Sequence, residues 1–193
     1  MPELSEFTQL REPKTMLLST ASLTSLASLL SPPAEAEPMQ KFLRFRLDRT
    51  QSMLLAVENI TAVQTVAILD ILPVPQMNPC VLGMSNWRGE SLWLVDLAQQ
   101  LGFQSIANRM TRLATLSVIV VQIDDHALGL VVPEIYEIEE YNPETLLNPS
   151  AELHSDQTFA FTKGYFKRDR SIVLDAAAVI QDPSLQTSHF KSL

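Results

Sequence analysis

The residues in this chain that could do chemistry are few, and their spacing matches no catalytic or metal-binding pattern. The three histidines, His126, His154 and His189, are scattered, and none has a second histidine at the i, i+4 spacing that places two metal ligands on one helical face. The sequence also lacks a G-x-S-x-G nucleophile motif and a glycine-rich phosphate loop. We therefore expect no enzyme activity, and we assign no catalytic residue, no metal site and no cofactor.

Two aspartates, Asp96 and Asp175, resemble a pair of catalytic carboxylates but are better explained as helix caps. Each follows an apolar run and precedes a short apolar segment, residues 97–101 and 176–180. An aspartate in this position accepts hydrogen bonds from the first N–H groups of a helix, which stabilises the helix by about 1 kcal/mol. Gly102, just past the first of these segments, is a typical stop signal.

Composition limits the classes of partner and compartment. The chain has 193 residues, a formal net charge of -8 and an isoelectric point near 4.8, so nucleic acid and anionic membranes are not expected as its main partners. Its single cysteine, Cys80, cannot form an intrachain disulfide and suits a reducing compartment, where we expect it to be a small buried apolar residue. The sequence has no apolar run long enough to span a bilayer and no secretory signal, which predicts a cytoplasmic protein without membrane insertion.

From residue 41 onward the sequence predicts short strands separated by turns. In the first strand Arg44 and Arg46 alternate with apolar residues, which predicts one buried face and one exposed face. Prolines mark a loop at 73–79, and a polar loop is expected at 142–157. The expected strands are residues 42–47, 53–57, 60–68, 113–123, 127–132, 135–140, 160–166 and 171–174, with two more flanking a charged turn at Trp87–Glu90.

A weak internal repeat indicates how these strands are grouped. Residues 83–96 are echoed by residues 164–175, and each copy contains a glycine, a strand, a charged turn, an apolar strand and an aspartate that opens a short helix. A unit of about five short strands is too small for a large sandwich, whereas a small closed barrel leaves no strand edge open to aggregation. The predicted fold class is therefore mainly β, with two small five-stranded β-barrels packed side by side and a few short helices.

The most specific motif of the chain is a V-L-G-x-x-N-x-R-G-x-x-x-x-x-V-D-L pattern at residues 81–97, preceded by F-L-R-F-R-L at residues 42–47. With these motifs, the segment from residue 41 to about 180 resembles the CheW-like domain, the coupling module of bacterial chemotaxis signalling. The resemblance implies SH3-like barrels that exchange strands at their ends. The implied boundaries are residues 1–38 for an N-terminal extension, 39–182 for the CheW-like domain, about 53–112 for the first barrel, about 113–174 for the second, and 183–193 for a C-terminal tail.

The N-terminal extension supports two interpretations. Its low charge and its serine and proline content favour a flexible tether. Leu23, Leu26 and Leu30 also have the spacing of an amphipathic helix that could dock on this protein or on a partner. The sequence alone leaves both open.

Proteins of the resembled family are adaptors that hold a CheA-like histidine kinase, by its regulatory domain, against the cytoplasmic tips of chemoreceptors. The resemblance thus implies a non-enzymatic adaptor in bacterial taxis or motility signalling, located at receptor arrays on the inner membrane face. Trp87 stands where an aliphatic residue is commoner, which indicates a branch serving pilus-driven motility or phototaxis. The alternative is a CheW-like scaffold in pilus machinery, or a competitor that limits kinase arrays, without receptor coupling.

The receptor contacts that the resemblance implies are Ile60, Gly83, Asn86 and Arg88. Arg88 suits this role because a guanidinium group offers a rigid fork of donors to carboxylate or backbone acceptors. An equally simple interpretation is that Arg88 only pins its own turn. Many relatives carry an acid at the position of Ala62 that can pair with this arginine, so here Arg88 either pairs with Glu58 or Glu90 or stays free.

The kinase contacts that the resemblance implies lie before the proline-rich loop. Ile71 matches an apolar position at the family's kinase-docking end, and Leu69 and Leu72 are next to it in the sequence. Apolar residues in such a loop either cover the core or form a docking surface. Three of them together predict an exposed patch.

Overall fold

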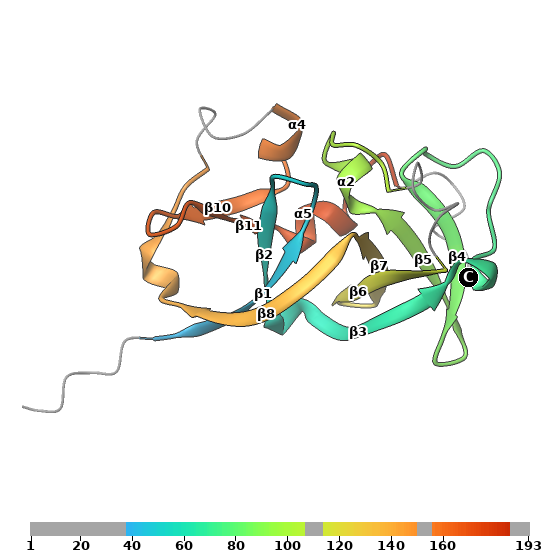
Figure 1. Cartoon of the computed structure of the whole chain (residues 1–193), viewed down its shortest axis with the longest axis horizontal. Coiled ribbons are helices and arrows are strands. Elements are labelled where there is room, and N and C mark those ends of the chain that lie inside the picture. The colour runs from blue at the N-terminus through green and yellow to red at the C-terminus, as the bar shows by residue number, and fades with distance from the viewer. Residues whose placement is uncertain (1–37, 107–113, 150–155, 186–193) are drawn as a thin grey trace, which may run out of the picture. The chain divides into compact units, whose positions relative to one another are not determined.

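A computed structural model of the chain describes residues 38–106, 114–149 and 156–185, which belong to one unit running from Pro38 to Leu193 (Figure 1). Of the N-terminal extension, only Pro38 is among the described residues, so the expected leucine helix lies outside them. His154 and His189 also lie outside the described residues.

Five strands form the sheet that we call sheet B, in the order β3-β6-β7-β5-β4. They are β3 (Ile60–Ala67), β4 (Val81–Trp87), β5 (Glu90–Asp96), β6 (Thr115–Ile123) and β7 (His126–Val132). Neighbours are antiparallel except β5 and β7, which are parallel. After β3 and a 3-10 turn, η2 (Ile68–Asp70), Leu72 pairs with Met84 of β4, so the curled sheet closes on itself.

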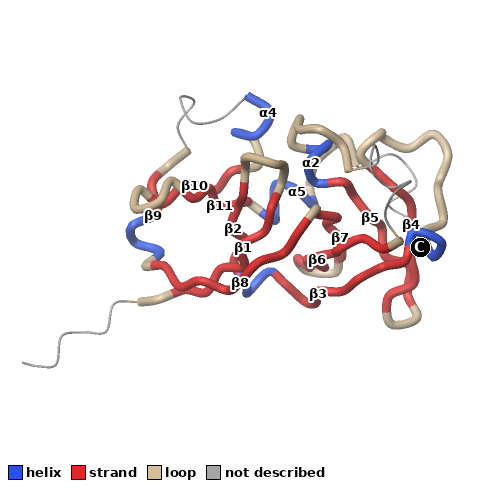
Figure 2. Tube along the Cα trace, in the orientation of Figure 1, coloured by secondary structure: helices blue, strands red, loops and turns tan. Residues whose placement is uncertain are grey.

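Six strands form the second sheet, sheet A, in the order β8-β1-β2-β11-β10-β9. They are β1 (Gln40–Arg46), β2 (Ser52–Ala56), β8 (Glu134–Tyr141), β9 (Leu146–Leu147), β10 (Thr162–Phe166) and β11 (Ser171–Leu174). The 3-10 turn η3 (Pro143–Thr145) leads from β8 into β9, so sheet A curls back in the same way as sheet B (Figure 2). Within the described residues, the remaining short helices are η1 (Val57–Asn59), α2 (Leu97–Gln100), α4 (Asp156–Phe159) and α5 (Ala176–Ile180). The fold is thus mainly β with two curled SH3-like sheets, as predicted.

The repeat is visible in three dimensions, but the sheets do not divide the chain at the expected barrel boundaries. The hairpin β4–β5 followed by α2 corresponds to the hairpin β10–β11 followed by α5. Each of these hairpins pairs in parallel with a second hairpin, β6–β7 in sheet B and β1–β2 in sheet A. The expected division between residues 112 and 113 therefore falls inside sheet B. Parallel pairings between distant segments leave no local sequence signal, so the grouping of strands into sheets cannot be predicted from local patterns.

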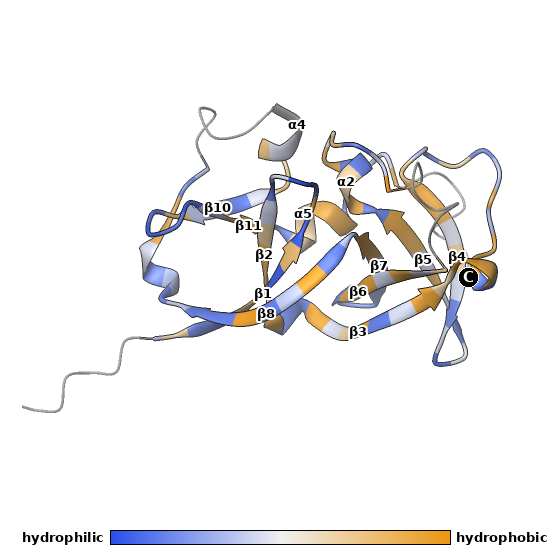
Figure 3. Cartoon of the chain, in the orientation of Figure 1, coloured by the Kyte–Doolittle hydropathy of each residue, from blue (hydrophilic) through white to orange (hydrophobic). Residues whose placement is uncertain are grey.

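Three apolar clusters fill the part of the chain that the structure describes. One lies within sheet A and includes Phe42 and Phe166; one lies within sheet B and includes Val118 and Leu94. The largest contains residues of both sheets and of α2 and α5, so it joins the two halves. The buried face expected for β1 is confirmed, because Leu43 and Phe45 lie in the shared cluster. The other face is only partly exposed, since Arg44 and Arg46 are half-buried and Phe42 is buried in the sheet A cluster. Figure 3 shows this apolar character along the strands and polar residues at the hairpin ends.

Candidate functional site

The β4–β5 hairpin positions the arginine singled out in the sequence at a tight two-residue turn. Arg88 and Gly89 both have positive φ angles, 54° and 90°. Two such residues in sequence form the turn whose twist matches that of the flanking strands. The amide of Gly89 donates a hydrogen bond to Oδ1 of Asn86 over 3.3 Å. Asn86 therefore stabilises the turn, and Arg88 occupies its tip.

The side chain of Arg88 is exposed and held against an aromatic ring. Its guanidinium carbon lies 4.8 Å from the centre of the Trp87 ring, within the range of a cation–π contact. Within the described ranges Arg88 forms no ion pair, with Glu58, Glu90 or any other acid. Of the alternatives left open above, a charge that stays free of carboxylates is the one observed. Its donors are available to acceptors on a partner.

Gly83 has a packing role that links this hairpin to the segment at residues 69–72, which was expected to contact a kinase. Its φ is +140°, and a Cβ added there would lie 2.3 Å from the carbonyl oxygen of Leu72. The amide of Leu72 donates to the carbonyl of Met84 over 2.7 Å, and the amide of Met84 donates back over 2.9 Å. Only glycine permits this approach, because any larger residue would collide with the Leu72 backbone. Gly83 itself is buried.

The segment expected to bind the kinase is only partly exposed. Leu69 is 95% exposed and Leu72 is 65% exposed, which are high values for leucine. Ile71 is only 8% exposed and packs in the sheet B cluster. The expectation of a patch made of all three residues is therefore wrong for Ile71. Side chains alternate in direction along an extended segment, so Ile71 points into the core and Leu72 points to the solvent.

Ile60 lies away from the Arg88 turn in the pairing of sheet B. It starts β3, which is separated from β4 by three strands in the sheet order, and it pairs with Val121. Ile60 also packs against the large shared cluster, whereas Trp87 packs against the sheet B cluster. Gly83, Asn86 and Arg88 thus share one hairpin, and Ile60 belongs to a different part of the sheet.

Sequence reasoning missed a polar cluster centred on Arg44 in β1. Its guanidinium group forms a bidentate ion pair with Glu139 of β8 and lies 3.0 Å from Oδ2 of Asp169 in the β10–β11 turn. The same group donates to the hydroxyls of Tyr141 over 2.8 Å and Ser171 over 2.9 Å. The alternation in β1 marked Arg44 as exposed, and its partners lie more than ninety residues away in the sequence, so no local signal could reveal them.

This cluster shifts the protonation equilibria of its members. The hydrogen bond from Arg44 outweighs partial burial and lowers the pKa of Glu139. Burial alone would raise the pKa of Asp169, but hydrogen bonds from Ser171 and Tyr141, together with the charge of Arg44, lower it to about 2. Burial, assisted by the two carboxylates, raises the pKa of Tyr141 to about 12. At neutral pH both carboxylates are therefore ionised and the phenol is neutral, which is the state that this network requires.

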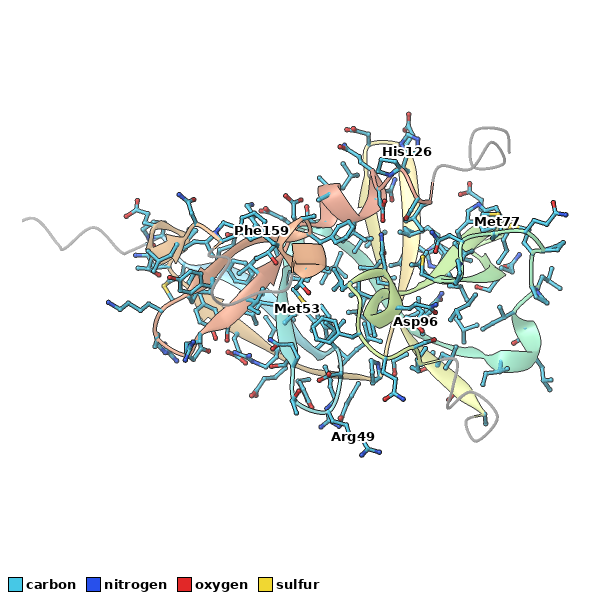
Figure 4. The ribbon with its side chains drawn as sticks, turned by 90° about the horizontal axis from the view of Figure 1, so that it is seen from above. Arg49, Met53, Met77, Asp96, His126 and Phe159 are labelled. Carbon is cyan, nitrogen blue, oxygen red and sulfur yellow. The ribbon has the colours of Figure 1, made fainter. Side chains whose placement is uncertain are left out.

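The remaining titratable candidates do not form a reactive site. Asp96 accepts a hydrogen bond from the amide of Gln99, and Asp175 accepts from Ala177 and Ala178, so both aspartates cap helices as expected. Figure 4 shows Asp96 beside α2, well separated from His126. Across the residues described, no three histidine, cysteine or acidic side chains gather as metal ligands would.

Cys80 is buried, as expected from the sequence. Burial, with the nearby charge of Asp182, raises the pKa of its thiol to about 11. The group is thus a protonated thiol at neutral pH and a poor nucleophile. None of the helices within the described ranges is long and apolar enough to cross a membrane.

Comparisons with known proteins agree with the fold. The sequence profile of the CheW-like domain matches residues 41–184, well over half of the chain. Among solved structures, the chain is similar to the scaffolding protein TtCheW from Thermoanaerobacter tengcongensis, with a TM-score of 0.59 and 20% sequence identity, covering 71% of this chain and 88% of that chain. No curated protein sequence matches the chain. An identity of this size shows a shared fold.

Proposed function

The chain belongs to the CheW-like domain family, a family of scaffolding proteins, and from this premise we propose that it is a non-enzymatic adaptor coupling chemoreceptors to a CheA-like histidine kinase. In this role it would act in the cytoplasm at receptor arrays, in taxis or pilus-driven motility. The observation that carries the proposal is the free Arg88 at the tip of the β4–β5 hairpin. A hairpin that held this arginine only for stability would place its donors on acceptors of its own chain.

The receptor-facing surface in this proposal is the tip of the hairpin. Arg88 supplies a fork of donors, and Trp87 limits the directions in which the fork can point. Asn86 contributes indirectly, because it holds the turn through Gly89. Ile60, which is partly exposed on β3 and lies away from this tip, would be a separate contact in the proposal.

The kinase-facing surface in this proposal consists of Leu69 and Leu72. Two leucines at this exposure form an apolar surface that a partner would cover. Leu72 is hydrogen-bonded to β4, the strand that also leads to Arg88. A receptor and a kinase bound at these two places would be held by one strand, which suits a coupling role.

The test is a reconstitution with the full chain, a cytoplasmic receptor fragment and the CheA-like kinase of the same organism. Replacing Arg88 by alanine should weaken receptor capture about tenfold, a loss of about 1.4 kcal/mol, and leave kinase capture unchanged. Replacing Leu69 and Leu72 by glutamate should weaken kinase capture and leave receptor capture unchanged. Arg49→Ala, at another exposed turn, and Phe159→Glu, at another exposed apolar residue, are the matched controls.

The same experiment separates the alternative functions. Kinase capture without receptor capture, unaffected by the Arg88 substitution, would indicate a competitor that limits kinase arrays. Capture of neither protein would indicate a CheW-like scaffold with other partners, such as pilus machinery. The absence of an acid at position 62, where Ala62 stands, is the feature that makes these alternatives worth measuring.

A further inference from the structure

The hairpin of sheet A that corresponds to the Arg88 hairpin carries a concentration of positive charge. Of the 14 lysines and arginines of the chain, four lie in residues 163–170, although the chain as a whole has a net charge of -8. Lys167, Arg168 and Arg170 occupy the β10–β11 turn and are all exposed. We call these three residues the basic tip; Figure 3 shows this turn as strongly hydrophilic.

The acid within this turn has hydrogen-bond partners of its own. Oδ2 of Asp169 lies 3.0 Å from Arg44 Nη2 and 2.6 Å from the Tyr141 hydroxyl, and the Ser171 hydroxyl donates to it over 2.6 Å. The amide of Ser171 donates to the other oxygen over 3.1 Å. Asp169 thus has internal partners for both oxygens, and it anchors the turn to β1 and β8.

Within the residues described, the three cations of the basic tip, Lys167, Arg168 and Arg170, form no ion pair. The guanidinium carbon of Arg168 lies 5.7 Å from the centre of the Tyr141 ring, and Arg170 has a positive φ of 58° that shapes the end of the turn. Because the turn is already fixed, a bound anion would cost little additional ordering of the backbone.

The surroundings of the basic tip limit the size of the anion that it can accept. The strand β8, which ends at Tyr141 below Arg168, exposes Glu137 and Glu140. A membrane surface or a nucleic acid extends over many charges and would meet these acids and the acidic remainder of the protein. A short segment with two or three carboxylates would contact the basic tip alone, and guanidinium groups match carboxylates in geometry.

We propose that the basic tip is a docking site for a short acidic segment of a partner protein, separate from the receptor- and kinase-facing surfaces of sheet B. The site depends on the Arg44 cluster, whose members form hydrogen bonds with the carboxylate of Asp169 and so hold the turn on sheet A. Binding is electrostatic and weakens as salt is added, because the cations are solvent-exposed. The proposal does not depend on receptor or kinase coupling.

The proposal is tested with the full chain and a fluorescein-labelled octaglutamate peptide, followed by fluorescence anisotropy at low salt. The wild-type chain should bind the peptide, and the Lys167→Gln/Arg168→Gln variant should bind it at least about tenfold more weakly. Arg49→Gln is the matched control, since it removes an exposed arginine from another turn of sheet A; peptide binding should be unchanged. Circular dichroism should show the same fold for all three proteins.

Several results would overturn the proposal. These are no binding of octaglutamate by the wild-type chain, equal binding by the double variant, or equal loss of binding in the Arg49 control. Phosphatidylglycerol vesicles and a single-stranded RNA are measured alongside. If either binds the basic tip as tightly as the peptide does, the site is a general polyanion surface and the assignment to an acidic protein segment is wrong. Weaker binding of both supports it.

Discussion

Arg88 occupies a backbone conformation that costs stability, which points to selection for its side chain. With φ at 54° it sits in the left-handed region, where non-glycine residues other than asparagine and aspartate are strained. The following Gly89 completes a turn for which asparagine–glycine is the preferred pair. A residue chosen for folding alone would be asparagine or glycine. Arginine at this position makes the turn less stable than asparagine would, but it provides an exposed guanidinium group with several hydrogen-bond donors.

Replacing Arg88 by asparagine should therefore raise stability while removing the proposed receptor contact. We expect the free energy of unfolding to increase by about 0.5–1 kcal/mol, as left-handed strain is relieved. Urea unfolding followed by circular dichroism measures this directly. Lower stability in the variant would show that the Arg88–Trp87 contact contributes more to folding than the strain costs.

Gly83 should be far less replaceable than its neighbour Gly89. An alanine at position 83 would place a Cβ 2.3 Å from the Leu72 carbonyl, whereas one at position 89 would meet nothing within 4 Å. Both glycines have positive φ angles, so both alanines would incur backbone strain of about 1–3 kcal/mol. Gly83→Ala should add a packing penalty of similar size, because Leu72 must move off β4.

Comparing the two variants by urea unfolding isolates the collision. Gly164→Ala provides a parallel measurement in sheet A, where the added Cβ would lie 2.4 Å from the Leu147 carbonyl. If Gly83→Ala proves no more destabilising than Gly89→Ala, the close approach of Leu72 to β4 is not a required feature of the fold.

At the residue scale, the sequence predicted what depends on local pattern and failed where distant segments meet. The turn at Arg88, the caps Asp96 and Asp175 and the burial of Cys80 follow from short-range signals, and all are confirmed. The expected exposure of Ile71 was wrong, because the inward orientation of its side chain depends on how that segment lies on β4. The roles of the proposed receptor- and kinase-binding residues remain predictions.

At the scale of elements, the Arg44 cluster connects three segments that are far apart in the chain. It joins β1, the end of β8 and the β10–β11 turn by charged hydrogen bonds. These bonds hold the turn on the sheet, so the stability of this end of sheet A should depend on the ionisation of its carboxylates.

The stability of the protein should therefore fall in acid partly because Asp169 becomes protonated. Its pKa in the folded protein is about 2, below its ordinary value of 3.8, so ionised Asp169 stabilises the fold at any pH above about 3.8. That contribution is lost as the pH falls through about 2. In an Asp169→Asn variant, the free energy of unfolding should decline less between pH 4 and pH 2 than in the wild type.

The measurement is a series of urea unfolding curves across that pH range. Because other carboxylates titrate in the same range, the informative quantity is the difference between the two slopes. Ser171→Ala removes one hydrogen bond to Asp169 and should give an intermediate slope. Identical slopes in all three proteins would mean that the ionisation of Asp169 does not stabilise the fold.

The existence of the elements was predictable, whereas their assembly was not. Hydrophobic alternation and turn residues located most strands within a few residues, because these signals act within one segment. The assignment of β6 and β7 to sheet B depends on parallel pairing of β5 with β7, between residues such as Leu94 and Gly129. Gly129 lacks a Cβ, which would lie 2.6 Å from a methyl group of Leu94. That fit becomes visible only when both strands are in place.

At the scale of the whole described unit, the two sheets share one core and should fold together. Sheet B is formed by a continuous stretch of chain, from Ile60 to Val132, inserted between the strands of sheet A. Along the strands of sheet B, the side chains alternate between two apolar clusters. Residues such as Val118 face the cluster inside sheet B, and residues such as Ile119 face the cluster shared with sheet A.

A fragment containing residues 57–133 should therefore fail to fold alone, although it includes every strand of sheet B. Without sheet A, apolar residues such as Ile119, Leu130 and Val132 would lose the contacts of the shared cluster and face water. Each such side chain contributes about 1.5–3 kcal/mol when buried, so losing several exceeds the 5–15 kcal/mol by which a typical domain is stable. The dispersion of amide proton shifts in NMR spectra of the fragment and of the full chain measures this, and a dispersed spectrum with a cooperative thermal transition for the fragment would contradict it. Failure to fold would mean that the Arg88 hairpin of sheet B and the basic tip of sheet A form only as parts of one cooperative structure. Partners bound at these two places would then always be held by the same folded unit.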